Sequence, residues 1–199
     1  MVHAFLIHTL LSRPGDEAGP CRVLYSRVFS PEGLDDAGGA DREKKKRIQK
    51  EQILVVARQV ESMCRLYQQA SGRPPSDHSV LLPDEPVSLQ DVPSGVFRLS
   101  SGDPFAEDKT VLWLGIHCLG FALVCDPHEN LMLAESALQL LVKSLLEHLK
   151  LLSSGSDVLL KADRIEVILG KVLPHGQLLF RNDQFVLGLE RELSASLSK

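Results

Sequence analysis

The pattern of apolar positions predicts two strands at the start of the chain. Residues 2–10 are apolar at nearly every position, which is typical of a strand that is covered on both faces and lies centrally in its sheet. Val2, Ala4 and Leu6 are expected to share one face of this strand. After a loop rich in turn-forming residues, positions 21–29 form a second β-rich run. One face of this second strand is expected to carry Cys21, Val23, Tyr25 and Phe29.

A helical pattern begins at Arg42 and lasts until a segment of helix breakers at residues 71–95. Its apolar residues recur at i, i+3, i+4 and i+7, which predicts an amphipathic helix with one buried stripe. The stripe comprises Ile53, Val56, Ala57, Val60, Met63, Cys64 and Tyr67. Residues 71–95 contain five Pro and no apolar period, so we expect a poorly ordered, mobile loop.

The second half of the chain predicts three more strands and then helices. Strands are expected at residues 96–100, 110–117 and 119–125. Helices are expected over 131–152, over 157–173 and from Asn182 onward. The order ββαβββ followed by helices predicts a single α/β (α+β) domain over residues 1–199, with a five-stranded antiparallel or mixed sheet.

The helix expected over 131–152 has more apolar surface than one sheet can cover. Its charged and amide side chains fall within an arc of roughly 120°, and Leu, Met, Val and Ala occupy about twice that arc. A helix on one sheet needs an apolar face of only about 100° to 140°. Either the following helices cover the rest or another protein does. In the second case the candidate partner-binding positions are Leu133, Leu140 and Leu151.

Composition and charge indicate which partners and which cellular compartment to expect for the chain. The net charge of −4 gives no overall reason to expect nucleic acid as a partner. The four Cys form no C-x-x-C pair, and the start of the chain lacks the cationic leader of a signal peptide, so we expect a cytoplasmic protein. The longest charge-free stretch, residues 110–125, is shorter than the roughly 20 residues of a membrane span.

Motifs for catalysis, metals and nucleotides are missing. The His and Cys residues around 117–129 match no zinc spacing, and neither a G-x-S-x-G elbow nor a phosphate loop occurs. We therefore expect no enzyme activity, no metal and no cofactor. The basic run 42–47 is best explained as a solvated helix start, while nuclear import and contact with an acidic membrane surface are the alternatives.

The element order, opened by the strand Met-Val-His-Ala-Phe-Leu-Ile-His, resembles the longin-type fold of adaptor-protein small (sigma) subunits. Further similar stretches lie at 95–98, 119–131 and 176–177. More narrowly, three segments resemble the sigma subunits of the fifth adaptor-protein complex, namely 50–66, 162–166 and 173–180. The resemblance spans nearly the whole chain and implies the longin-like fold.

This resemblance also implies a role. It implies a non-catalytic subunit of a heterotetramer with zeta, beta and mu subunits, peripheral on late endosomes and lysosomes. It further implies vesicle-mediated protein sorting with spatacsin and spastizin as the scaffold in place of clathrin. Two other classes remain open from the residues alone: an autonomous longin-type regulator of a small GTPase or membrane-fusion protein, and a nuclear accessory protein that uses the basic run.

Clathrin-associated sigma subunits read acidic dileucine signals in a pocket. The resemblance implies that the corresponding positions of this cargo pocket are Arg22, Phe121, Leu141 and Leu151. Two features depart from the family pattern: a longer loop before Arg22, and Lys150 where a small polar residue is usual. The stem of this lysine would cover the cleft. We therefore expect that acidic dileucine peptides do not bind.

Overall fold

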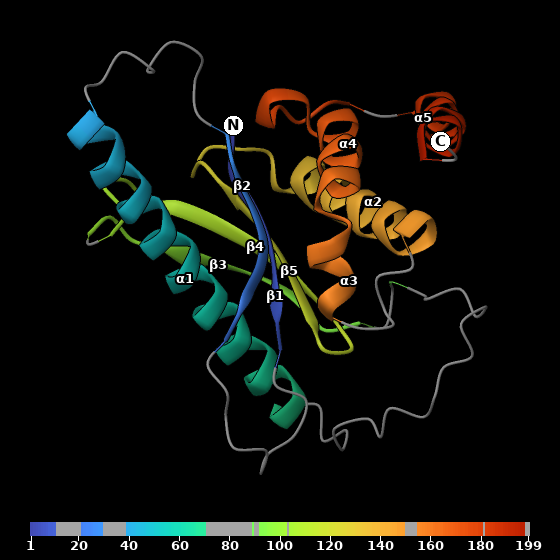
Figure 1. The fold of residues 1–199 in the computed structure, drawn as a ribbon. Helices are drawn as coiled ribbons and strands as arrows, with labels where there is room; N and C mark the ends of the chain where they lie inside the picture. Colours follow the sequence, from blue (N-terminus) through green and yellow to red (C-terminus); the bar gives the residue numbers. More distant parts are fainter. Residues whose placement is uncertain are drawn as a thin grey trace.

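The strands form one antiparallel sheet. The computed structural model describes residues 1–10, 21–29, 39–70, 89, 92–102, 104–149, 155–180 and 182–197. Its strands are β1 (Val2–Thr9), β2 (Val23–Val28), β3 (Ser94–Leu99), β4 (Lys109–Ile116) and β5 (Leu119–Cys125). They lie in the order β2-β1-β5-β4-β3, and every neighbouring pair is antiparallel (Figure 1). The chain therefore has the predicted ββαβββ order, and β1 is an interior strand, between β2 and the middle strand β5.

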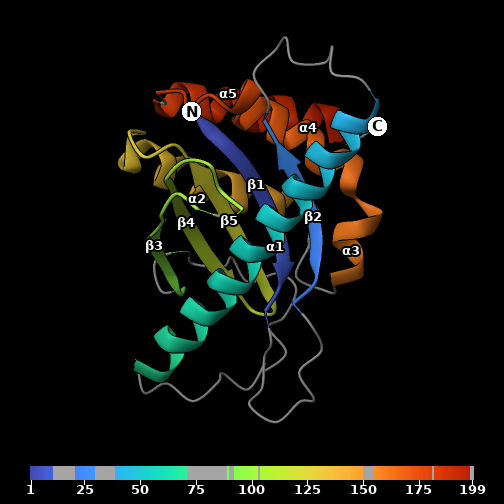
Figure 2. The same cartoon turned by 90° about the vertical axis from the view of Figure 1, so that its left-hand side faces the viewer.

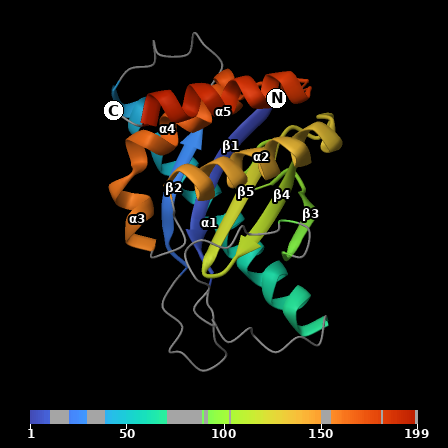
Figure 3. The same cartoon turned by 90° about the vertical axis from the view of Figure 1, so that its right-hand side faces the viewer.

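Helices cover both faces of this sheet. Figure 2 shows α1 (Gly39–Ala70) crossing one face. Figure 3 shows the opposite face, which is covered by the later helices. These are α2 (Leu131–Leu149), α3 (Gly155–Leu160), α4 (Ala162–Val172) and α5 (Asp183–Leu197), with a short 3-10 turn, η1 (Pro174–Gly176), before α5. None of the helices described is both long and apolar enough to span a bilayer.

A hydrophobic core lies on each face because β1, β4 and β5 are apolar at successive positions. Phe5 and Ile7 pack toward the α2 to α5 side, whereas Ala4 and Leu6 pack beneath α1. Asn130 begins α2, since its Oδ1 accepts hydrogen bonds from two backbone N–H groups of the first turn, at 3.0 and 3.2 Å. Asn182 caps α5 in the same way, as predicted.

Two strand irregularities overturn the predicted faces. Val2 packs with Phe5 rather than with Ala4, because the pairing with β5 shifts register between Val2 and Ala4. In β2 the register shifts opposite His8, so Val23 faces α1 while Tyr25 faces the other layer. A single extra residue reverses every side chain beyond it, and apolar alternation alone does not reveal where it is inserted.

The helix predicted over 157–173 is two helices, α3 and α4, which meet at Lys161. This residue has φ −109° and ψ 19°, and its Nζ donates a hydrogen bond to the carbonyl of Leu149 at 2.6 Å. The lysine thus satisfies a carbonyl at the end of α2, one of the groups that a helix terminus leaves without an internal partner. Helix α2 is described as far as Leu149, and residues 150–152 of its predicted span lie outside the described residues.

Other boundaries also differ from the prediction. Most of the loop predicted over 71–95 lies outside the described residues, but its last two residues begin β3. Gly95 lies under the Trp113 ring, where a Cβ would come within 2.9 Å of the indole nitrogen. Tyr67, predicted on the buried stripe of α1, has 44% of its surface exposed.

The turn after α4 returns the chain to the sheet. Gly176 has φ +74°, a conformation that side chains disfavour, and a Cβ there would meet the carbonyl of Val2 at 2.7 Å. Its lack of a side chain allows η1 to lie against β1 and Phe29. This turn places the connection to α5 beside the start of β1.

Candidate interaction surfaces

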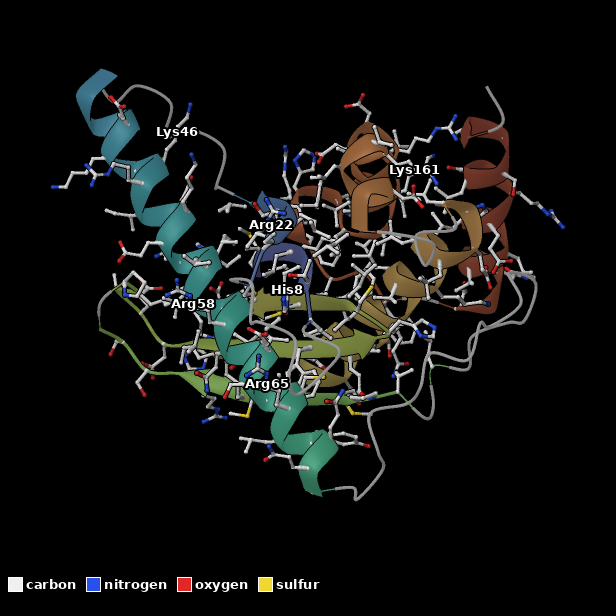
Figure 4. The ribbon with its side chains drawn as sticks, turned by 60° about the horizontal axis from the view of Figure 1, so that its bottom comes forward. His8, Arg22, Lys46, Arg58, Arg65 and Lys161 are labelled. Atoms are coloured by element: carbon white, nitrogen blue, oxygen red, sulfur yellow. The ribbon has the colours of Figure 1, made fainter. Side chains whose placement is uncertain are left out.

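Arg22, the predicted cation of the cargo pocket, lies directly before β2 and is exposed. Its backbone is held by Thr9, whose Oγ1 accepts a hydrogen bond from the Arg22 N–H at 3.0 Å. The Thr9 N–H in turn donates to the Arg22 carbonyl at 2.9 Å. Figure 4 shows Arg22 and His8 among the labelled side chains. The guanidinium group is therefore in solvent at the end of a well-paired strand.

The predicted apolar walls of the pocket lie in the core. Phe121 and Leu141 each have 0% of their surface exposed and belong to the same cluster between the sheet and α2. The structure thus brings these two residues together but leaves neither of them open to solvent, and Leu151 lies outside the described residues. A dileucine signal would need them to move before it could contact either side chain.

A buried imidazole lies near Arg22. His8 has 0% exposure, its Nδ1 lies 3.0 Å from the Thr9 carbonyl and 3.5 Å from Cys21 Sγ, and its Nε2 has no hydrogen-bond partner. Burial lowers the pKa of His8 to about 4, although the bond to Thr9 opposes the shift. The ring is therefore neutral at pH 7 and Nδ1–H is the donor to Thr9. Strand alternation places His8 on the same face as Ala4 and Leu6, and its neighbour Cys21 packs against the core on that α1 side.

The thiol beside this imidazole is not activated. Burial, aided by the charge of Glu61 and opposed by that of Arg58, raises the pKa of Cys21 to about 11. A thiol with this pKa stays protonated at pH 7, so the pair does not resemble a Cys–His nucleophile. In the described parts of the chain, no three His, Cys, Asp or Glu side chains are grouped so that they could hold a metal ion.

A second polar group lies where β4 begins and β5 ends. Lys109 has 8% exposure, and its Nζ lies 2.8 Å from Asp126 and 3.4 Å from Glu107. Burial by itself would raise the pKa of Asp126, but hydrogen bonds from Lys109 and from the amino group of Met1 lower it. These ion pairs join the ends of β1, β4 and β5, and we assign them a structural role.

The wide apolar arc of α2 is largely covered by its own neighbours. Helices α4 and α5 both pack on α2, and eight α2 residues are buried. Of the predicted partner-binding positions, Leu133 and Leu140 are half-buried and Leu140 packs against the core; Leu151 lies outside the described residues. The large apolar side chains that α2 exposes lie in its first turn, at Leu131 and Met132, which are 39% and 75% exposed.

Ion pairs hold the helical layer together. Glu166 of α4 accepts a hydrogen bond from the Tyr25 hydroxyl and lies 3.1 Å from the Arg27 guanidinium, so it ties α4 to the edge strand β2. Lys171 of α4 lies 2.6 Å from Glu192 of α5. Helix α2 packs against both α4 and α5 and completes this layer.

Several large apolar side chains are exposed on this layer, although folding alone gives no reason to expose them. We call them the apolar set. It consists of Leu131, Met132, Leu159, Leu160, Val167, Phe180 and Leu187. Leu160 and Phe180 are the extremes, at 82% and 85% exposure. Where such side chains lie close enough together to form a patch, the patch is typical of a surface that another protein covers.

Comparison with known proteins identifies the family. The sequence model of the family described as AP-5 complex subunit sigma-1 matches residues 1–194. The chain belongs to this family. The human AP-5 complex subunit sigma-1 is 59% identical over 197 residues, which cover 98% of each chain. The mouse protein of the same description is 56% identical over 154 residues, covering 77% of this chain and 91% of the mouse protein.

Among solved structures, one match is described as a homology model of the full-length AP-3 complex in a stretched open conformation. It has 19% sequence identity and a TM-score of 0.48, and covers 100% of this chain and 96% of that chain. The resemblance to adaptor sigma subunits is thus confirmed by the family match, and the α+β class by the structure itself. The chain is a subunit of an adaptor complex.

Proposed function

We propose that the chain is the non-catalytic sigma subunit of a heterotetramer with zeta, beta and mu subunits, acting in protein sorting at late endosomes and lysosomes. Spatacsin and spastizin are the scaffold in this proposal, and the chain reaches the membrane as part of the complex. The family match over residues 1–194 supports the subunit role. The main support for assembly with other subunits is the apolar set, because these exposed side chains give the helical layer an apolar surface that a partner can bury.

The exposed apolar side chains of the helical layer indicate where a partner subunit would bind. Obligate interfaces commonly bury on the order of 2,000 Å² or more and resemble a domain core cut in half. The apolar set supplies such contacts from α2, α3, α4, α5 and the connection before α5, while Leu140 is already occupied by the chain's own core. We infer that α2 contributes mainly its first turn, including Leu133, and that Leu160, Val167 and Phe180 are the main anchors.

Co-purification tests this proposal. The tagged chain should recover zeta, beta and mu subunits from cells, and Leu160→Asp, Val167→Asp and Phe180→Asp should each reduce that recovery because a carboxylate would be buried in the interface. The matched control is Leu66→Asp on α1, a residue that is 55% exposed on the opposite face. Retained recovery by all three folded variants would overturn the proposed surface. Recovery of a small GTPase instead would favour the autonomous regulator.

The site of action has its own test. Imaging should place the tagged chain on late endosomes and lysosomes, and depletion of spastizin should reduce that signal because the scaffold is part of the proposal. A nuclear signal that depends on residues 42–47 would instead favour the nuclear accessory protein.

A further inference from the structure

The outer face of α1 is a long helix surface on the side away from the sheet, and the main contacts of α1 in the described residues are with the strands. Figure 2 shows α1 in front of the sheet, on the side opposite to α2 and α5. Its inner stripe, including Val56, Val60 and Cys64, is buried against the sheet. Its outer positions face solvent between residues 43 and 70. Because the apolar set lies on the other side of the sheet, a partner bound there leaves this face free.

Two chemically distinct rows run along this outer face. One row is cationic: Arg47, Arg58 and Arg65 lie within about 20° of one another at about 100° per residue, and all three are exposed. Figure 4 shows Arg58 and Arg65, together with Lys46, along the length of α1. From Arg47 to Arg65 the row extends about 27 Å at about 1.5 Å per residue. We call it the arginine row.

The second row is aliphatic and lies beside the first. Ile48 and Leu66 occupy the same angular position on the helix and are 40% and 55% exposed. Val55 lies between them and is half-buried. Exposed aliphatic side chains next to long cationic ones give this face the character of a helix that lies at a membrane interface.

Charge is distributed unevenly between α1 and the rest of the chain. Residues 39–70 contain eight Lys and Arg against four Asp and Glu, a net charge of +4, whereas the whole chain carries −4. The remainder is therefore strongly acidic. Near an anionic surface such a charge distribution orients the molecule with α1 toward that surface. Within the arginine row, Arg65 has an ion pair with Glu61 at 3.0 Å, and it remains half-exposed.

We propose that the outer face of α1 binds directly to the anionic lipid headgroups of a bilayer. The cations supply the attraction, and the aliphatic row contacts the boundary of the acyl chains. An acidic helix of another protein fits less well, since a helix–helix seam requires apolar residues every three or four positions. Here the exposed aliphatic residues Ile48 and Leu66 are 18 positions apart, and Val55 between them is half-buried. The face is also a single convex helix surface, which suits a flat bilayer.

Vesicle flotation of the purified full chain tests this inference. The chain should float with vesicles of phosphatidylcholine containing phosphatidylserine and not with phosphatidylcholine alone. Binding should weaken as salt rises from about 0.1 M to about 0.5 M, because screening shortens the reach of exposed charges. The variant Lys44→Glu/Arg47→Glu/Arg58→Glu should reduce binding at least about tenfold. The variant Ile48→Ser/Leu66→Ser should reduce it less and leave the salt dependence intact.

The matched control reverses three exposed cations away from α1, as Arg98→Glu/Arg164→Glu/Arg191→Glu. It changes the net charge equally and should retain vesicle binding. No binding by the wild-type chain, or equal losses in both triple variants, would overturn the inference. So would protection of the α1 outer face by another subunit in the assembled complex. The proposed assembly is tested separately, since the α1 variant should still recover the partner subunits.

Discussion

Acid should destabilise the fold through the imidazole of His8. Its pKa is about 4 in the folded chain because of burial, against 6.5 for an exposed histidine. Between these values the unfolded chain binds a proton that the folded chain does not, so stability falls as the pH falls below 6.5. By proton linkage, the free energy of unfolding falls by about 2 kcal/mol between pH 7 and pH 5. The decrease reaches about 3 kcal/mol below pH 4.

The matched variant is His8→Asn, whose side-chain amide can donate to the Thr9 carbonyl as Nδ1–H does but does not titrate. Urea unfolding of both proteins at pH 7 and pH 5 isolates the effect, because other titrating groups contribute equally to each. Wild type should lose about 2 kcal/mol more than the variant over this interval. Equal losses in the two proteins would refute the reasoning and show that His8 is protonated without cost in the folded chain.

Three further predictions follow from single contacts. Gly120→Ala should cost about 1 to 3 kcal/mol in urea unfolding, because its Cβ would lie 2.4 Å from His8 Nε2; Gly102→Ala, with nothing within 4 Å, is the control and should be neutral. Glu166→Gln should cost about 1 kcal/mol in the same assay by weakening the tie to β2, and an unchanged midpoint would contradict that role. Titration of an acidic dileucine peptide into the assembled complex should show no saturable binding, because the pocket walls are buried; binding that disappears in Arg22→Ser would contradict this.

The arrangement of strands and helices was predictable because apolar periodicity reports burial directly. Residues 2–10 are apolar on both faces, and β1 is an interior strand covered on both faces. Register was not predictable, since the shifts near Val2 and opposite His8 depend on pairing with other strands. The break at Lys161 was hidden for a similar reason: the lysine satisfies the end of α2, which is distant in sequence.

The interaction surfaces were less accessible to sequence reasoning. A leucine in a core and a leucine in a protein–protein interface cannot be distinguished by residue type. Only the fold shows that Leu140 is half-buried against the core and that Leu160 is exposed. Transfer of a family position likewise gives no information on accessibility, as Phe121 and Leu141 illustrate. His8 could have been recognised as buried from its place in an apolar strand, but its unpartnered Nε2 could not.

An experimental structure of the assembled complex would test the central claim most directly, namely that this chain is an adaptor subunit held through its helical layer. We expect Leu160, Val167 and Phe180 to lose their exposure to a large subunit while the arginine row of α1 stays uncovered. Burial of the α1 outer face by protein, with these three side chains still in solvent, would contradict the account.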